Sequence, residues 1–89
     1  MGTSRRPRPA RLASKLRQIR NSLGLTQEQL GVLLTTRKSA VYPGHVSEFE
    51  TGKREPSLLT LLAYARVARV PMETLVDDKL ELSTKLSGI

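Results

Sequence analysis

The chain has 89 residues, which is the length of one small domain. Its 15 Lys and Arg residues outnumber its 8 Asp and Glu residues, and the formal net charge of +7 favours an anionic partner, most often nucleic acid, over a merely soluble surface. The absence of cysteine and the presence of one histidine exclude a disulfide framework and the usual zinc sites, and an aromatic content of 3% favours a helical bundle with an aliphatic core.

Other classes of function have little support in the residues. No apolar run approaches the roughly 18 residues that cross a membrane, and the N-terminus lacks the apolar segment of a secretory signal. The paired carboxylates of Asp77 and Asp78 stand at a helix end without a catalytic partner, and no glycine-rich phosphate loop is present. We therefore expect a cytoplasmic protein that is not an enzyme and has no cofactor, metal or small-molecule ligand.

Residues 1–10 are expected to form a basic, flexible arm. Arg5, Arg6 and Arg8 alternate with two prolines, and such a segment has no apolar face to bury. Two roles are open for it. The arm lies along DNA phosphates or in a minor groove, or it is a flexible tail that only increases solubility.

The first predicted helix starts at Pro9 or Arg11 and ends at Leu23, before Gly24. Its buried stripe recurs at helical spacing and consists of Leu12, Leu16, Ile19 and Leu23. Lys15 falls outside this stripe.

The second predicted helix has the clearest start in the sequence. Thr26 is its N-cap, and Gln29 three positions later completes a capping box. The helix runs to about Leu34, and it buries Leu30 together with Leu33 or Leu34.

A polar, basic loop follows over residues 35–42. Pro43 suits the first turn of a helix, so a third helix is expected over residues 43–51, ended by Gly52. Val46 and Phe49 face inward from this helix.

Two more helices complete the predicted all-α fold. Ser57 caps a fourth helix that runs to about Ala68, and a short fifth helix covers residues 71–76. The buried stripe of the fourth helix is expected to be Leu58, Leu61, Leu62, Ala65 and Ala68. The tail over residues 78–89 stays open, because a short strand, a helical turn and a frayed end all fit its few leucines.

Three motifs occur in order along this pattern: L-G-L-T-Q-E-Q-L-G, V-S-E-F-E-T-G-K-R-E-P and V-P-M-E-T-L. Together they resemble the Cro/repressor-type (XRE-like) helix-turn-helix family over about residues 12–77. The resemblance implies a compact five-helix bundle of the lambda-repressor-like type, with its DNA-binding domain at residues 11–77. It also implies a recognition helix at residues 43–51 in the major groove of double-stranded DNA.

The resemblance implies roles for single residues as well. Gln27 matches a glutamine that braces against phosphate and base, and Arg20 pairs with Glu50 to tie the first helix to the third. The expected base contacts are Gln27 and four residues on the outward face of the third helix, namely Gly44, His45, Ser47 and Glu48. The expected phosphate contacts are Thr26, Arg37, Lys38, Ser39, Lys53 and Arg54. His45 either contacts a base or caps its own helix.

The sequence departs from the family at one point. The interval between Gln27 and the V-S of the third helix is longer than usual, so residues 35–42 replace a tight turn with a lengthened loop. Under one hypothesis Arg37, Lys38 and Ser39 lie beside the DNA groove and contact it. Under the other, the loop is simply solvated.

Apolar residues off the buried stripe indicate an interface. Leu59, Ala63, Leu75, Leu80 and Leu82 predict an exposed apolar patch and a homodimer that binds an inverted-repeat operator. The alternative is a monomer with scattered surface leucines. The expected function is transcription regulation, in particular repression, and the alternative is an antitoxin-like module that neutralises a protein partner and autoregulates its operon.

Overall fold

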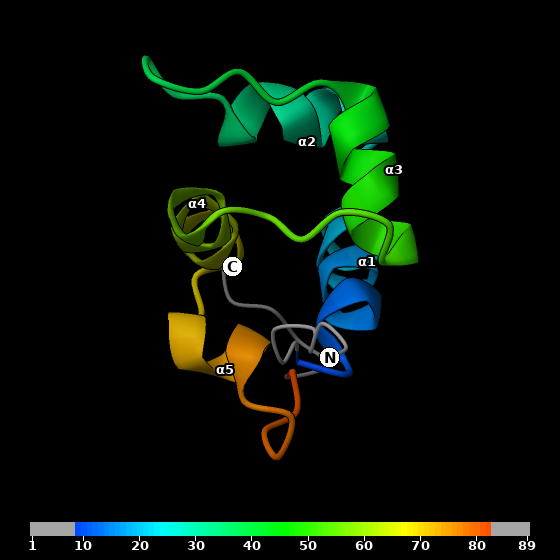
Figure 1. The fold of residues 1–89 in the computed structure, drawn as a ribbon, viewed down its shortest axis with the longest axis vertical. Helices are drawn as coiled ribbons and strands as arrows, with labels where there is room; N and C mark the ends of the chain where they lie inside the picture. The colour runs from blue at the N-terminus through cyan, green and yellow to red at the C-terminus, as the bar shows by residue number, and fades with distance from the viewer. Residues whose placement is uncertain (1–8, 83–89) are drawn as a thin grey trace, which may run out of the picture.

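The structure is a computed structural model that describes residues 9–82. Its helices are α1 (Leu12–Leu23), α2 (Gln27–Leu34), α3 (Pro43–Thr51), α4 (Leu58–Ala68) and α5 (Met72–Val76). In Figure 1, α2 lies across the upper end of the molecule, α1 and α3 run down one side, and α4 and α5 occupy the other. No strand occurs between residues 9 and 82, and the predicted all-α class with five helices is confirmed.

Local signals in the sequence set most of the helix ends. Thr26 and Ser57 are the N-caps of α2 and α4, and each hydroxyl oxygen accepts a hydrogen bond from the backbone N–H three residues later. Gly24 and Gly52 follow α1 and α3 with φ angles of 70° and 78°. Glycine adopts this left-handed conformation without a steric penalty, so each helix stops there.

One core joins all five helices. Its buried apolar residues are Leu12, Leu16, Ile19, Leu30, Leu34, Val41, Val46, Phe49, Leu61, Tyr64, Ala65, Ala68, Leu75 and Leu82. The predicted inward face of α3 is confirmed, because Val46 and Phe49 are both buried. Phe49 meets Tyr64 of α4 edge-on, with ring centroids 6.3 Å apart.

The buried face of α4 differs from the predicted stripe. Leu58 is 69% exposed, whereas Tyr64 is fully buried between Leu61 and Ala68. A stripe that starts at Leu61 has the same helical spacing, so periodicity alone does not fix its register. The Tyr64 hydroxyl has no hydrogen-bond partner within residues 9–82, and burial raises its pKa.

Lys15 is buried, which corrects its predicted place outside the apolar stripe of α1. Its Nζ donates to the backbone carbonyl oxygens of Thr74 at 2.8 Å and Asp77 at 2.9 Å. These carbonyls lie at the end of α5, where a cation satisfies groups that have no partner within the helix. The aliphatic stem of Lys15 is buried on the way to them, as long basic side chains allow.

The segment after α5 packs against the start of α1. The carboxylate of Asp78 accepts hydrogen bonds from the backbone N–H groups of Ala10 at 2.8 Å and Arg11 at 3.0 Å, and these bonds lower its pKa. Asp78 thereby caps a helix whose own N-cap, Arg11, has no side-chain cap. Leu82 adds to the core, while the remainder of the predicted arm and tail, residues 1–8 and 83–89, lies outside the described residues.

Two further findings concern the described part of the chain. None of its helices is long and apolar enough to cross a membrane. Residues 9–82 also hold no group of three or more His, Asp or Glu side chains that could bind a metal ion.

Candidate nucleic-acid interface

A buried ion pair fixes α3 relative to α1. Arg20 Nε lies 2.7 Å from Glu50 Oε2, and Arg20 Nη2 lies 3.1 Å from Glu50 Oε1. Arg20 Nη1 also donates to the Leu25 carbonyl oxygen at 3.0 Å, so the guanidinium holds the α1–α2 turn as well. The hydrogen bonds with Glu50 raise the pKa of Arg20. The pair that the sequence predicted is therefore present, with both side chains largely shielded from water.

The first turn of α2 is held by its own cap and by α3. Thr26 Oγ1 accepts from Gln29 N–H at 3.0 Å, and Gln29 Oε1 accepts from Thr26 N–H at 2.9 Å, which confirms the predicted capping box. Gln27 Nε2 donates to Glu50 Oε1 at 3.4 Å. Because Glu50 is itself fixed by Arg20, the start of α2 and the last turn of α3 are positioned as one unit.

A hollow of about 200 Å³ lies where α1, α2 and α3 meet, and we call it the α3 hollow. It is lined by Arg17, Arg20, Gln27, Ser47, Glu50 and Thr51. Two of the predicted base contacts, Gln27 and Ser47, thus face the same space. Arg17 was not predicted as a site residue, although its position three residues before Arg20 places it on the same side of α1.

Glu48 and Arg54 form an ion pair with each other, at 2.7 Å between Glu48 Oε1 and Arg54 Nε. The sequence predicted one as a base contact and the other as a phosphate contact, without this link. The bond from Arg54 holds the pKa of Glu48 below its ordinary value. The Glu48 carbonyl also accepts from the Lys53 and Arg54 N–H groups at 2.9 and 3.2 Å, which places both basic residues at the end of α3.

His45 caps α3, one of the two roles that the sequence left open. Its Nδ1 accepts a hydrogen bond from the Tyr42 N–H at 3.2 Å, and the two rings lie 5.6 Å apart between centroids. The backbone at Gly44 is open, because a β-carbon built there would meet nothing within 4 Å. The first turn of α3 is therefore fixed by His45, while the backbone at Gly44 stays open to solvent.

The lengthened loop over residues 35–42 is fixed to α2. Thr35 Oγ1 donates to the Gly31 carbonyl at 2.9 Å and accepts from the Val41 N–H at 2.9 Å. A β-carbon at Gly31 would lie 2.7 Å from the Val41 carbonyl oxygen, so the two backbones approach more closely than any other residue would permit. Val41 itself is buried in the core.

The tip of the loop is a tight turn. Thr36 and Ser39 exchange two backbone hydrogen bonds, of 2.8 and 3.2 Å, with Arg37 and Lys38 between them. Ser39 lines a hollow of about 230 Å³ together with His45 and Arg54. Arg37 and Lys38 lie in another hollow, so the three predicted loop contacts are divided between two surfaces.

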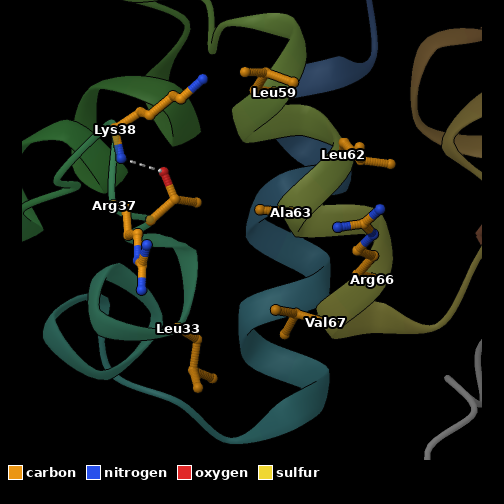
Figure 2. Close-up of a pocket in the computed structure, with 9 residues that line it drawn as sticks. Leu33, Arg37, Lys38, Leu59, Leu62, Ala63, Arg66 and Val67 are labelled. Atoms are coloured by element: carbon orange, nitrogen blue, oxygen red, sulfur yellow. Dashed lines mark hydrogen bonds between the residues drawn. The ribbon is translucent and has the colours of Figure 1, made fainter.

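This second hollow, which we call the α4 hollow, has a volume of about 410 Å³ between the loop and α4. Its lining consists of Leu33, Thr36, Arg37, Lys38, Leu59, Leu62, Ala63, Arg66 and Val67. Figure 2 shows Arg37, Lys38 and Leu33 on one side, opposite Leu59, Ala63 and Val67.

The predicted apolar patch requires a correction. Leu75 is fully buried and Leu82 is 6% exposed, because α5 and the segment after it close the base of the core. Leu59 remains 64% exposed and lines the α4 hollow with Ala63. Leu80, at 37% exposure, is absent from that hollow.

Comparisons with known proteins agree with this architecture. A sequence model of the helix-turn-helix family matches residues 16–75, well over half of the chain. No curated protein matches the chain. Among solved structures, it is similar to the P22 c2 repressor protein in complex with synthetic operator 9T in the presence of Tl⁺, with a TM-score of 0.66 and 22% sequence identity. That match covers 75% of this chain and 94% of the other, and it establishes a shared fold.

Proposed function

The chain belongs to the helix-turn-helix family, and from that premise we propose that it is a DNA-binding transcription regulator, in particular a repressor. In this proposal α3 is the recognition helix and lies in the major groove of double-stranded DNA. The solved structure that shares the fold is a repressor bound to a synthetic operator, which supports the proposal.

The observation that carries the proposal is the α3 hollow. Gln27 and Ser47 face one space from two helices, and both helices are fixed through the buried carboxylate of Glu50. A binding surface gains affinity when its groups are held in place before the partner arrives, because less conformational entropy is then lost. Arg17 lines the same hollow and supplies positive charge beside it, as phosphate contacts require.

The proposed contacts divide into two kinds. Base edges would be contacted by Gln27, Gly44, Ser47 and Glu48, and by His45 through Nε2, the ring nitrogen that takes no part in the cap. Phosphates would be contacted by Thr26, Arg17, Ser39, Lys53 and Arg54. The Glu48–Arg54 ion pair gives this surface a specific property. Arg54 can bind a phosphate fully only when it leaves Glu48, and Glu48 then accepts a hydrogen bond from a cytosine amino group or repels the backbone.

We also propose that two copies bind an inverted repeat, with half-sites about 34 Å apart, or one helical turn. Val76 and Leu80 are each 37% exposed, so the region of α5 retains apolar surface for a two-fold contact. The mass of the protein in solution, measured by light scattering with and without a duplex, tests this part separately.

A second candidate function is an antitoxin-like module that neutralises a protein and regulates its own operon. The exposed apolar lining of the α4 hollow is the observation in its favour, because such surfaces often mark protein interfaces. Stable copurification of a neighbouring gene product that loses its activity on binding would favour this candidate over a simple repressor.

The experiment for the main proposal is selection of bound sequences from a random pool of duplex DNA. We expect an inverted repeat to be enriched, and we expect Ser47→Ala to relax the preference at one position of each half-site. A pool that remains random after repeated selection, at low salt as well as at physiological salt, would contradict sequence-specific binding.

A further inference from the structure

We propose that the α4 hollow is a docking site for an acidic amphipathic helix of a partner protein. This inference goes beyond the proposed DNA-binding function and does not depend on it. The α4 hollow and the α3 hollow have no lining residue in common.

The floor of the α4 hollow is apolar and open to solvent. Leu33 is 53% exposed and Leu59 is 64% exposed, although Leu30 and Leu34 of α2 and Leu61 of α4 are buried in the core. The side chains of Leu33 and Leu59 lie on opposite sides of the space in Figure 2, and Ala63 and Val67 of α4 also line it. A volume of about 410 Å³ is in the range of small-molecule sites in proteins.

The spacing of the apolar residues fits a helix as the occupant. Leu59, Ala63 and Val67 recur every fourth residue, so they form a straight row along α4 of about 12 Å, or two helical turns. An amphipathic helix laid in such a groove inserts its own apolar row, as in other helix-in-groove complexes.

The rim of the hollow is positively charged. Arg37 and Lys38 stand on the loop and Arg66 stands on α4, and none of the nine lining residues is acidic. Within residues 9–82 none of these three cations forms an ion pair. A partner with Asp or Glu beside its apolar row would supply the missing charges, and like charges would be rejected.

The loop wall of the hollow is already in place before any partner binds. Thr36 and Ser39 close the turn that presents Arg37 and Lys38, and the Lys38 N–H donates to Thr36 Oγ1 at 3.3 Å. The lengthening of this loop relative to related proteins thus builds one side of a groove. A preformed wall reduces the entropy that docking costs.

A second copy of the chain is a poor occupant because the rim of the hollow is positively charged. A two-fold contact through the α4 hollow would bring the cationic rim of one copy against that of the other, with no acidic residue to compensate. The segment at residues 83–89 fits no better, because its sequence contains a lysine and no Asp or Glu.

The test uses the whole chain and a display library of helical peptides of about 18 residues, which exceeds the length at which isolated helices are marginal. We expect the selected peptides to combine an apolar row at helical spacing with flanking Asp or Glu. Affinities of one selected synthetic peptide for the variants then locate its site. Leu59→Ser and Arg66→Glu are expected to weaken binding about tenfold or more.

Matched controls exist beside each lining residue. Leu58 is 69% exposed and Val32 is 70% exposed, yet neither lines the hollow, so Leu58→Ser and Val32→Ser should change peptide affinity by less than about twofold. Circular dichroism checks that every variant folds. Leu59→Ser should also bind duplex DNA as the wild type does, which separates this proposal from the DNA-binding one.

Three results would overturn the inference. The selected peptides could lack acidic residues, or they could bind Leu59→Ser as tightly as the wild type. Light scattering could instead show a dimer that Leu59→Ser alone converts to a monomer, in which case a second copy fills the hollow.

Discussion

The buried pair of Arg20 and Glu50 makes a quantitative prediction about stability. In Arg20→Met the aliphatic stem is kept and the guanidinium is removed, so Glu50 loses both hydrogen bonds from Arg20 and retains one from Gln27, at 3.4 Å. Removing one partner from a buried ion pair costs about 3–5 kcal/mol. The side chain of Arg20 is 18% exposed, so the environment is not fully dry, and we expect about 3 kcal/mol.

Replacing the other partner, Glu50, should lower the free energy of unfolding by less. Glu50 has a side chain that is only 4% exposed, whereas Arg20 is nearer to water and keeps its bond to the Leu25 carbonyl. An unpaired Arg20 is therefore partly solvated, and we expect Glu50→Met to destabilise by about 1–2 kcal/mol. The double variant replaces the pair with apolar groups, and its loss should be well below the sum of the two single losses.

Urea denaturation followed by circular dichroism measures the three free energies of unfolding, and equal m-values show that the unfolding reaction is unchanged. The reasoning is refuted if Glu50→Met is more destabilising than Arg20→Met, or if the two single losses add in the double variant. Additive losses would mean that the pair does not hold α3 against α1, and a larger loss for Glu50→Met would mean that Arg20 is not the better solvated partner.

Three further predictions concern the loop, the α3 surface and pH. Gly31→Ala should destabilise by about 1–3 kcal/mol in the same denaturation assay, because its β-carbon meets the Val41 carbonyl oxygen at 2.7 Å. Glu48→Gln should tighten binding to duplexes of unrelated sequence, because Arg54 is released to bind a phosphate. The slope of the logarithm of the affinity against the logarithm of the salt concentration should then steepen by about the amount expected for one more phosphate contact. The pKa of Asp78 is lowered in the folded state, so its carboxylate stabilises the fold above the unfolded pKa of about 3.9. That stabilisation is lost as the pH falls through the folded pKa. In Asp78→Asn the free energy of unfolding should therefore fall less steeply with decreasing pH.

Each of these variants has a matched control in the chain. Gly44→Ala places a β-carbon in open space within α3, so it should stabilise by up to about 1 kcal/mol, and a loss as large as that of Gly31→Ala would contradict the steric argument. Glu73→Gln removes the same charge from an exposed position in α5. If it changes the salt slope as Glu48→Gln does, or the acid stability as Asp78→Asn does, then net charge explains the effect and the specific contacts do not.

The local part of the fold follows from the sequence. Thr26 with Gln29, Pro43 and Ser57 predict where α2, α3 and α4 begin, because capping depends on residues only three or four positions apart. The ends at Gly24 and Gly52 follow from the left-handed conformation that glycine permits.

Long-range contacts account for what the sequence did not predict. The buried ammonium of Lys15 depends on carbonyl groups at Thr74 and Asp77, about sixty positions further along the chain. Leu75 and Leu82 looked available for an interface because a helix of five residues and the segment after it carry too few positions to define a face. Their burial follows only from the way α5 closes the core.

The candidate site shows the same division. The resemblance of the motifs to a family predicts the pair of Arg20 and Glu50, which the structure contains. The pairing of Glu48 with Arg54 depends on the turn after α3, and no periodic pattern indicates it. Arg37 and Lys38 are expected phosphate contacts because of their charge and their place in the loop, and the structure adds that both line the α4 hollow.

The most direct test of the central claim is a titration of the ¹⁵N-labelled chain with duplex DNA, followed by NMR at several salt concentrations. We expect the amide signals of Gln27, Ser47 and Thr51 to shift on binding while those of Leu59 and Ala63 stay unchanged. The logarithm of the affinity should fall linearly with the logarithm of the salt concentration. Absence of binding at low salt, or shifts confined to α4 and α5, would contradict the assignment of α3 as the DNA-binding face.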